Sequence, residues 1–399
     1  MNTAAAPAPP GSSPRTRWHR LRVTDVRRPT AGTVAVTLDV PAALRTVFAH
    51  RPGRHVVVRH RAGDAELRRS YSLCPPPYAP ETLRLVIGRG RPDGFGAHAA
   101  TRLAPGDHLE LSPPTGSFAL PDLPGAHHVL LAGGTGITPL APMATHALRR
   151  DPACRVTLVH SVRTSADALL ADELALVKDE FVDRLAVLHV LTREERGSGG
   201  GPLAGRLDAG ALRRLLAAVD ARPGRNTTYA LCGPPGLVDT ARQVLAEEGA
   251  DPSRVRWELF TPGDTPRQAP QQPAPSTPAM ATTPATATAP PPETAAAVAA
   301  APATEAASAR VTALLDGRRR TATVLPGDPV LLDALLRAHP DVPYACREGV
   351  CGSCRAKVLS GRVTADGQHA LDERDRAAGY TLVCRARPAT PDLTLDFDA

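Results

Sequence analysis

Apolar and polar positions alternate along the first third of the chain. Short runs with this alternation are separated by Gly and Pro turns and include HRLRVTDVRR, GTVAVTLDV, HVVVRH, LRRSYSL and TLRLVIG. Such runs are typical of strands that bury one face and expose the other. We therefore predict an antiparallel β-barrel for residues 15–122. Residues 1–14, mostly Ala, Pro and Ser, are expected to be a disordered tail.

From His127 onward the apolar runs become continuous and alternate with helical patterns. The strands are HHVLLAGG, RVTLVHSV, RLAVLHVLT, TTYALCGPP and RVRWELF, and the helices include PLAPMATHALRR, ADALLADELALVK and GLVDTARQVLAEEG. Strands that are apolar along their length are buried on both faces, as in a parallel sheet covered by helices. Residues 123–262 are predicted to form an α/β domain around such a sheet.

A low-complexity segment separates this region from the last part of the chain. Residues 263–308 consist largely of Pro, Ala, Thr and Gln, which predicts an interdomain linker that proline keeps partly extended. Beyond the linker, RVTALLDGRRRTATVLPG reads as a hairpin, PVLLDALLRAHP as a helix and LTLDFDA as a last strand. We predict a third, compact α+β domain of the β-grasp type at residues 309–399.

The composition narrows the classes of function. The 399 residues carry a net charge of +7, but the arginines are spread along the chain and no aromatic residues interleave them, so nucleic-acid binding is not expected. No apolar stretch is long enough to cross a bilayer and the N-terminus lacks a leader pattern, which predicts a cytoplasmic protein without a membrane partner. Seven cysteines, three of them in CREGVCGSC, indicate metal ligation in a reducing compartment rather than disulfides.

Four of the cysteines have the spacing of a plant-type [2Fe–2S] site. Three follow the pattern C-x4-C-x2-C and the fourth comes about thirty residues later, in GYTLVCRA. A structural zinc site is the alternative, but zinc motifs generally pair two short C-x2-C units, whereas this division is three plus one. The predicted cluster ligands are Cys346, Cys351, Cys354 and Cys384.

The segment Arg69-Ser70-Tyr71-Ser72 closes a predicted strand and fits the pattern R-x-Y-S. This pattern resembles the flavin-binding motif of the ferredoxin–NADP⁺ reductase superfamily. The resemblance implies that Arg69 binds a flavin phosphate, that Tyr71 stacks on the isoalloxazine ring and that Ser72 reaches flavin N5. Taken alone, the same residues could be a barrel-core aromatic and a surface charge.

Downstream, GRPDGFGAHAATRL lies where this family begins a short helix whose N-terminal amides hold the flavin pyrophosphate. Relatives usually carry serine after the phenylalanine, whereas Gly96 follows Phe95 here. Phosphate binding would then depend more on backbone amides and on Arg69. FAD is the expected flavin, with FMN as the alternative.

Two glycine-containing turns end predicted parallel strands and should face one crevice at the carboxyl edge of the sheet. The first turn runs directly from HHVLLA into a helix, and a purely structural glycine turn is its alternative interpretation. The crevice is the predicted nicotinamide site. Its residues are Gly133, Gly134, Thr135, Gly136 and Thr138 in the first turn, and Cys232, Gly233 and Pro234 in the second.

By the same resemblance, Thr135 and Cys232 bring nicotinamide C4 toward flavin N5, while Glu258 and Phe260 line the flavin. Ser72, Cys232 and Glu258 are the residues expected to act in catalysis. Arg163 and Ser165 occupy the place where NADPH-dependent members bind the 2′-phosphate, which favours NADPH over NADH. A helix cap beside a solvated arginine is the alternative there.

Nicotinamide gives up a hydride and a cluster accepts one electron, so a flavin is needed between them. From about Trp18 to Ala399 the chain resembles the reductase subunits of bacterial phenylacetyl-CoA epoxidases. This implies an NAD(P)H-dependent reductase of phenylacetate catabolism that serves a diiron oxygenase. Alternatives are a reductase for a Rieske oxygenase, a steroid hydroxylase or a cytochrome P450. A ferredoxin-like carrier or redox sensor with an impaired flavin domain is the alternative of another class.

Overall fold

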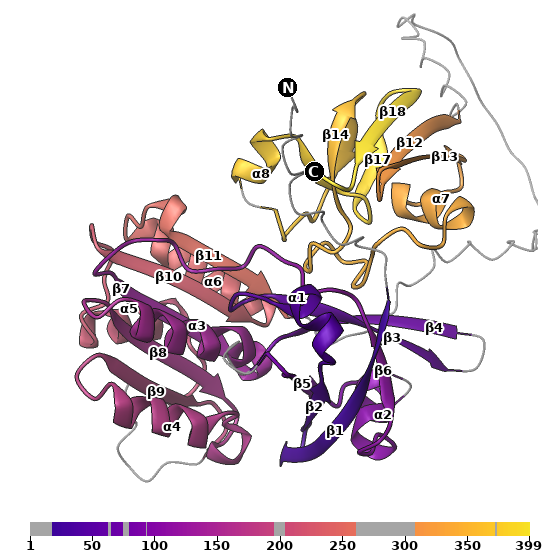
Figure 1. Cartoon of the computed structure of the whole chain (residues 1–399). Coiled ribbons are helices and arrows are strands. Elements are labelled where there is room, and N and C mark those ends of the chain that lie inside the picture. The colour runs from indigo at the N-terminus through magenta and orange to yellow at the C-terminus, as the bar shows by residue number, and fades with distance from the viewer. Residues whose placement is uncertain are drawn as a thin grey trace, which may run out of the picture.

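Three large β-sheets, one after another along the chain, organise the protein (Figure 1). This computed structural model describes residues 18–62, 65–74, 80–92, 94–194, 204–260, 308–371 and 373–399. The expected tail and, apart from its last residue, the expected linker lie outside the described residues. Within the described residues, no helix is both long and apolar enough to cross a membrane.

The first sheet has six strands in the order β4-β3-β6-β1-β2-β5, and all of its strand pairs are antiparallel. An isolated bridge between Leu73 and Leu85 joins the two ends of this order, so the sheet closes into the predicted barrel. Its core is a cluster of buried Val, Leu, Ile and Phe side chains. The elements are β1 (His19–Thr30), β2 (Thr33–Asp39), η1 (Ala42–Leu44), α1 (Arg45–Phe48), β3 (His55–Ala62), β4 (Ala65–Ser72), β5 (Thr82–Gly88), α2 (Phe95–Thr101) and β6 (His108–Leu111).

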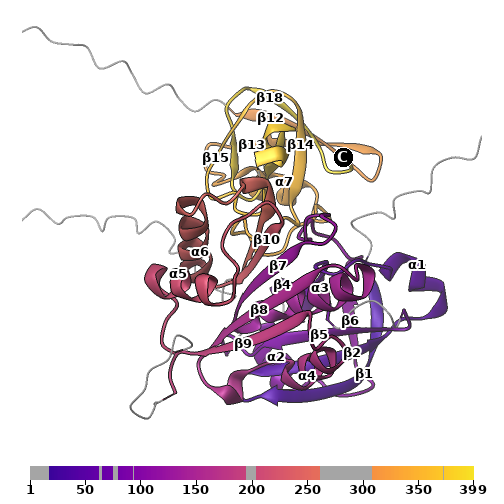
Figure 2. The ribbon, with the colours of Figure 1, turned by 90° about the vertical axis from the view of Figure 1, so that its left-hand side faces the viewer.

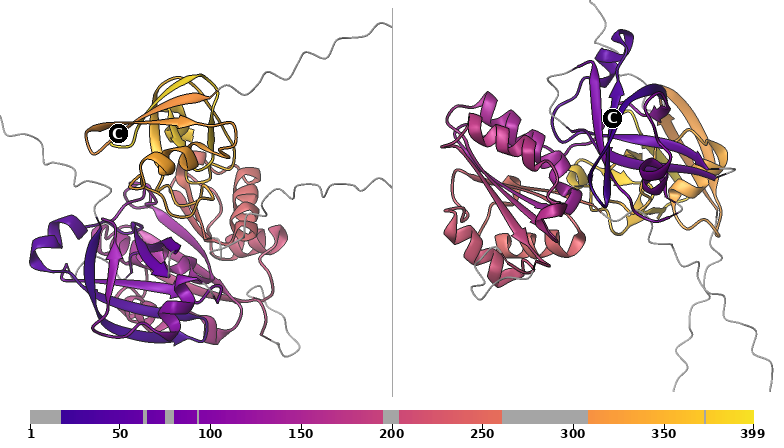
Figure 3. Two further views of the ribbon diagram at one scale, coloured as in Figure 1. Left: turned by 90° about the vertical axis from the view of Figure 1, so that its right-hand side faces the viewer. Right: turned by 90° about the horizontal axis from the view of Figure 1, so that it is seen from below.

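The second sheet has five parallel strands in the order β11-β10-β7-β8-β9. The strands β7 and β10 are buried at every position, as their apolar sequences require. Helices cover both faces, which Figure 3 shows from below. The elements are β7 (His127–Gly133), η2 (Gly134–Gly136), α3 (Ile137–Arg150), β8 (Arg155–Val162), η3 (Ser165–Asp167), α4 (Ala171–Glu180), β9 (Leu185–Leu191), α5 (Ala209–Ala218), β10 (Thr227–Gly233), α6 (Pro235–Glu247), η4 (Pro252–Arg254) and β11 (Val255–Leu259).

The third sheet has the order β13-β12-β18-β14-β16, in which β12 and β18 pair in parallel and the other neighbours are antiparallel. The predicted hairpin turns at Asp316 and Gly317, both with positive φ (52° and 70°), as a two-residue hairpin turn needs. The elements are β12 (Ala309–Leu315), β13 (Arg318–Val324), α7 (Leu331–Ala338), β14 (Arg355–Ser360), β15 (Val363–Ala365), α8 (Glu373–Ala377), β16 (Tyr380–Leu382), β17 (Ala386–Pro388) and β18 (Asp392–Asp396), with β15 and β17 forming a small sheet of their own.

The third unit lies over the junction between the barrel and the α/β unit, as Figures 1 and 2 both show. Val350, which belongs to the cysteine-rich loop, packs in the hydrophobic cluster of β10, α5 and α6. The side chain of Arg68 on β4 donates to carbonyl oxygens of Pro340 and Val342. The loop that carries three of the four predicted ligands therefore faces both of the other units.

Candidate functional site

A cleft with a volume of about 1770 Å³ runs between the three units. Strands of the barrel, the carboxyl edge of the parallel sheet and the cysteine-rich loop all contribute to its lining. Most of the residues predicted from the sequence lie on this lining: Arg69, Tyr71, Ser72, Phe95, Gly96, Gly133, Gly134, Thr135, Thr138, Arg163, Pro234, Glu258, Phe260, Cys346 and Cys351. The predicted residues that do not line it are Gly136, Ser165, Cys232, Gly233, Cys354 and Cys384.

The R-x-Y-S residues lie at the end of β4. Tyr71 contacts Phe95 with ring centroids 5.9 Å apart and planes inclined by 52°. Burial raises the pKa of the Tyr71 phenol, which keeps it protonated at neutral pH. The Arg69 guanidinium donates to the Arg68 carbonyl at 2.9 Å. An aromatic ring, a buried Ser72 hydroxyl and a cation thus share one wall of the cleft.

The departure from the family pattern at Gly96 has a steric cause. A Cβ atom at this position would lie 2.1 Å from the carbonyl oxygen of Gly88 and 2.7 Å from that of Arg89. Helix α2 therefore contacts the end of β5 backbone to backbone, and a serine would not fit there. Glycine allows this close approach. The missing serine is therefore a requirement of the backbone contact and does not indicate an impaired flavin site.

The two glycine turns meet at the carboxyl edge of the parallel sheet, as predicted. A Cβ on Gly136 would lie 2.2 Å from the Cys232 carbonyl oxygen, and one on Gly233 would lie 2.9 Å from the Gly133 Cα. Cys232 itself is fully buried beneath the turns, and burial raises the pKa of its thiol well above the usual value. At this carboxyl edge of the sheet the glycine turns expose backbone without side chains, which a flat ligand can approach closely.

A histidine that the sequence analysis did not single out supports the first turn. His160 is fully buried on β8, and its Nε2 lies 2.8 Å from the Gly134 carbonyl oxygen. Burial lowers the His160 pKa to about 4, so the ring is neutral and donates from Nε2 to this carbonyl. Thr138 Oγ1 donates to the Thr135 carbonyl at 2.9 Å, which fixes the other side of the turn. The sequence signal for His160 was a polar residue inside the apolar run RVTLVHSV.

All three units meet at Glu258, His55 and Ser353. Glu258 Oε1 lies 4.0 Å from His55 Nδ1, and His55 Nε2 lies 3.4 Å from Ser353 Oγ. Burial raises the Glu258 pKa to about 8, with a smaller contribution from Cys351, and burial lowers the His55 pKa. At neutral pH the carboxyl group is therefore mostly protonated and the imidazole is neutral. Glu258 Oε2 and His55 Nδ1 have no hydrogen-bond partner among the described residues.

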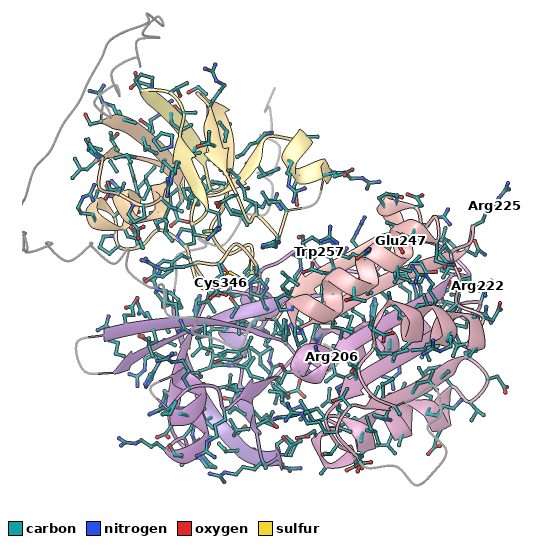
Figure 4. The ribbon with its side chains drawn as sticks, turned by 180° about the vertical axis from the view of Figure 1, so that it is seen from behind. Arg206, Arg222, Arg225, Glu247, Trp257 and Cys346 are labelled. Atoms are coloured by element: carbon teal, nitrogen blue, oxygen red, sulfur yellow. The ribbon has the colours of Figure 1, made fainter. Side chains whose placement is uncertain are left out.

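The predicted 2′-phosphate donors face carboxylates. The Ser165 amide and hydroxyl both donate to Glu194 Oε1, at 2.7 and 2.6 Å. Arg163 Nε lies 3.8 Å from Asp167 Oδ2. Arg206, which Figure 4 labels on the α/β unit, also lines the cleft and was not predicted.

The four predicted cluster ligands form two pairs. Cys346 interacts with Cys351 and Cys354 with Cys384, and these contacts together with burial raise the pKa values of Cys346 and Cys354. Two irons with two thiolates each fit the pairs, so the donor set fits a [2Fe–2S] cluster.

Glycines shape the cluster loop. Gly349 and Gly352 have φ values of 76° and 69°, and a Cβ on Gly349 would lie 2.0 Å from the Gly367 carbonyl oxygen. Figure 4 shows Cys346 at the face where the third unit meets the other two. The predicted cluster site is therefore directed at the cleft.

Comparison with known proteins agrees with this geometry. The family described as the 2Fe-2S iron-sulfur cluster binding domain matches residues 313–389, and the oxidoreductase NAD-binding domain matches residues 130–243. The chain is 30% identical over 389 residues to one of the subunits of 1,2-phenylacetyl-CoA epoxidase from Escherichia coli (strain K12), covering 96% of this chain and 99% of that protein. It is 32% identical over 382 residues to the ferredoxin reductase component of Rhodococcus rhodochrous 3-ketosteroid-9-alpha-monooxygenase, covering 94% and 96%.

Among solved structures, phthalate dioxygenase reductase matches 95% of this chain and 98% of its own, with a TM-score of 0.53 and 21% identity, so the fold is shared. Fold and site define the class of protein, an electron-transfer oxidoreductase that combines NAD-binding and [2Fe–2S] domains. The chain belongs to the ferredoxin–NADP⁺ reductase superfamily, in the branch with a C-terminal plant-type ferredoxin domain that includes the matched component of the E. coli epoxidase. Its cofactors are NAD(P)H, FAD and a [2Fe–2S] cluster, which confirms the fold class and cofactors predicted from the sequence.

Proposed function

We propose that this chain is the reductase component of a multicomponent oxygenase and passes electrons from NAD(P)H through FAD and the cluster to the oxygenase. The observation that carries the proposal is the cleft lined by the barrel, the glycine turns and Cys346 and Cys351. A bound flavin supplies the conversion between a two-electron hydride donor and a one-electron cluster. The chain supplies position rather than acid–base chemistry.

The proposed roles follow from where the residues lie. Arg69 and the backbone around Gly96 hold the flavin phosphates, because a cation and free helix-terminal amides favour an anion. Tyr71 and Phe260 contact the ring system. Ser72 would donate a hydroxyl hydrogen bond to the bound flavin, and the protonated Glu258 carboxyl group would donate another.

The nicotinamide half depends on the two turns. Gly133 and Gly233 lack side chains where the two turns pack against each other. Gly134, where a Cβ would meet nothing within 4 Å, and Thr135, which offers a hydroxyl, line the cleft where the coenzyme would approach. We assign the buried Cys232 thiol to packing beneath the turns. The division into a flavin domain (15–122), a nicotinamide domain (123–262) and a ferredoxin domain (309–399) is part of this proposal.

The arrangement at the coenzyme end favours NADH, contrary to the expectation from the sequence. Glu194 already accepts both Ser165 donors, and Asp167 pairs with Arg163. A carboxylate accepts a hydrogen bond from a ribose 2′-hydroxyl and repels a 2′-phosphate. Replacing Glu194 by Gln should therefore shift the ratio of kcat/KM values toward NADPH, while Glu180→Gln, whose carboxylate pairs with Arg149 on the surface, should not.

We further propose a diiron oxygenase of the phenylacetyl-CoA epoxidase type as the acceptor, supported by the 30% identity to the E. coli epoxidase component over nearly the whole of both chains. The 32% identity to the ferredoxin reductase component of the ketosteroid monooxygenase makes a steroid hydroxylase the alternative acceptor to test. A cytoplasmic location belongs to the same proposal, because free thiols must stay reduced until the cluster is assembled.

An anaerobic titration of the purified protein tests the electron path. Its visible spectrum should contain flavin and iron–sulfur bands, and NADH should bleach both, faster than NADPH does. Electrons should then reach a purified diiron epoxidase and not a purified steroid hydroxylase. Iron–sulfur bands without flavin bands would instead indicate a ferredoxin-like carrier or redox sensor and would contradict the proposed reductase function.

A further inference from the structure

Arg68 connects the barrel to the ferredoxin domain, and all three of its guanidinium nitrogens are hydrogen-bonded. Nε donates to Glu66 Oε1 at 2.7 Å within the barrel, Nη1 to the Val342 carbonyl at 3.3 Å, and Nη2 to the Pro340 carbonyl at 3.2 Å. The side chain is only 6% exposed. A buried guanidinium with each nitrogen satisfied is held in a fixed orientation.

The segment that Arg68 holds leads directly into the cluster loop. Between Val342 and the first cluster ligand, Cys346, stand three residues, and the ring of one of them, Tyr344, lies 4.3 Å below the Arg68 guanidinium. Two carbonyls and an aromatic face therefore fix this segment against β4. Because the segment is short, the position of Cys346 relative to the barrel follows from these contacts.

The neighbour of Arg68 on the same strand is Arg69, whose side chain lines the cleft with Tyr71. One strand thus carries both the residues proposed to hold the flavin and the residue that holds the cluster loop. Small displacements between reacting centres reduce rates strongly, so such a shared support has a direct effect on transfer between them.

We propose that Arg68 is a positioning residue for electron transfer from flavin to cluster, because it fixes the ferredoxin domain in its docked position. The inference rests on the proposed function and deepens it. Arg68 is itself among the residues that line the cleft, but this role requires contact with neither the flavin nor the cluster. Loss of its side chain would leave the Pro340 and Val342 carbonyls and the Glu66 carboxylate without the guanidinium that joins them.

Arg59 is a matched control. It is the cross-strand partner of Arg68 in the pairing of β3 and β4, and both guanidinium groups lie over Trp18, at 4.5 and 5.1 Å. Arg59 Nε donates to Glu110 Oε2 at 2.9 Å, so this ion pair stays within the barrel. Arg59→Ala removes a comparable arginine without removing a described hydrogen bond to the ferredoxin domain.

The test uses the full-length holoprotein with Arg68→Ala, Arg68→Lys and Arg59→Ala. Ferricyanide is used to take electrons from the flavin and cytochrome c to take them through the cluster. With either acceptor, one NAD(P)H yields NAD(P)⁺ and one proton and reduces two acceptor molecules. Hydrogen exchange of residues 340–346 reports docking without reference to activity.

Arg68→Ala should lower cytochrome c reduction roughly tenfold, keep ferricyanide reduction and speed exchange at residues 340–346. Arg68→Lys keeps the charge but cannot fork onto two carbonyls, so an intermediate effect is expected, and it serves if the alanine variant does not fold. Arg59→Ala should resemble the wild type in all three measurements. Equal exchange and equal acceptor ratios in Arg68→Lys and Arg59→Ala would overturn the role of Arg68. A wild type that reduces neither acceptor would instead contradict the proposed function.

Discussion

His55 and Ser353 lie within 3.4 Å of each other, Nε2 to Oγ, although 298 positions separate them in the chain. The first belongs to a barrel strand and the second stands between two predicted cluster ligands. Ser353 Oγ is also 3.3 Å from Cys351 Sγ. A continuous line of contacts therefore joins the wall of the cleft to a thiol of the proposed cluster site.

Replacing Cys384 by Ser should remove the cluster, because each iron depends on one pair of thiolates. We expect the iron content and the cluster absorbance to be lost and ferricyanide reduction to persist. Cys154→Ser is the control, since Cys154 is equally buried but lies in the α/β domain. Iron retained in Cys384→Ser would contradict the ligand assignment.

Gly96→Ala should destabilise the flavin domain by about 2 kcal/mol or more, because the added Cβ would meet backbone carbonyls that cannot move aside. Thermal unfolding and flavin retention measure the effect. The matched control is Gly236→Ala, at the same second position of its helix, where a Cβ meets nothing within 4 Å. Similar unfolding temperatures for the two variants would show that the close contact at Gly96 is absent.

His160→Phe should weaken coenzyme binding, because it removes the donor to Gly134 from a fully buried position. We expect KM for NAD(P)H to rise roughly fivefold to tenfold with a smaller change in kcat. His189→Phe is the control, since His189 is the neighbour of His160 in the next strand and its Nε2 has no hydrogen-bond partner among the described residues. An unchanged KM in His160→Phe would mean that the turn holds its shape alone.

Glu258 should make stability depend on pH. Its pKa is raised by burial to about 8 in the folded chain from a usual 4.5, so the folded state binds this proton more tightly than the unfolded state. The stabilisation is complete below about pH 4.5 and is lost as the pH rises through about 8. Unfolding temperatures measured across this window should fall less steeply in Glu258→Gln than in the wild type. Glu180→Gln is the control, and equal slopes in Glu258→Gln and the wild type would contradict the raised pKa.

Local patterns in the sequence predicted the fold and much of the cleft. Alternation of apolar and polar residues predicted the barrel, and continuous apolar runs predicted the parallel sheet. Cysteine spacing predicted the cluster. Each of these patterns can be recognised within a short stretch of sequence. Contacts between domains carry no such signal. Arg68 and His55 read as ordinary strand residues, and only the folded chain shows that they contact residues more than 270 positions away.

Charge states were equally hidden. Ser165 and Arg163 have the residue types of a phosphate site, but Glu194 and Asp167, which face them, change what the site can accept. The pKa of the Glu258 carboxyl group is raised because residues from the three units bury it. Neither effect follows from residue type or spacing alone.

The Cys354–Cys384 pair joins the loop before β14 to the segment after β16, about thirty residues further along the chain. A ligand that binds only the folded state stabilises it by an amount that rises with the logarithm of the free ligand concentration above Kd. A cell short of iron would therefore hold more of this protein with an open C-terminal domain, within reach of proteases. We expect the cellular amount of the reductase, and not only its activity, to follow the iron supply.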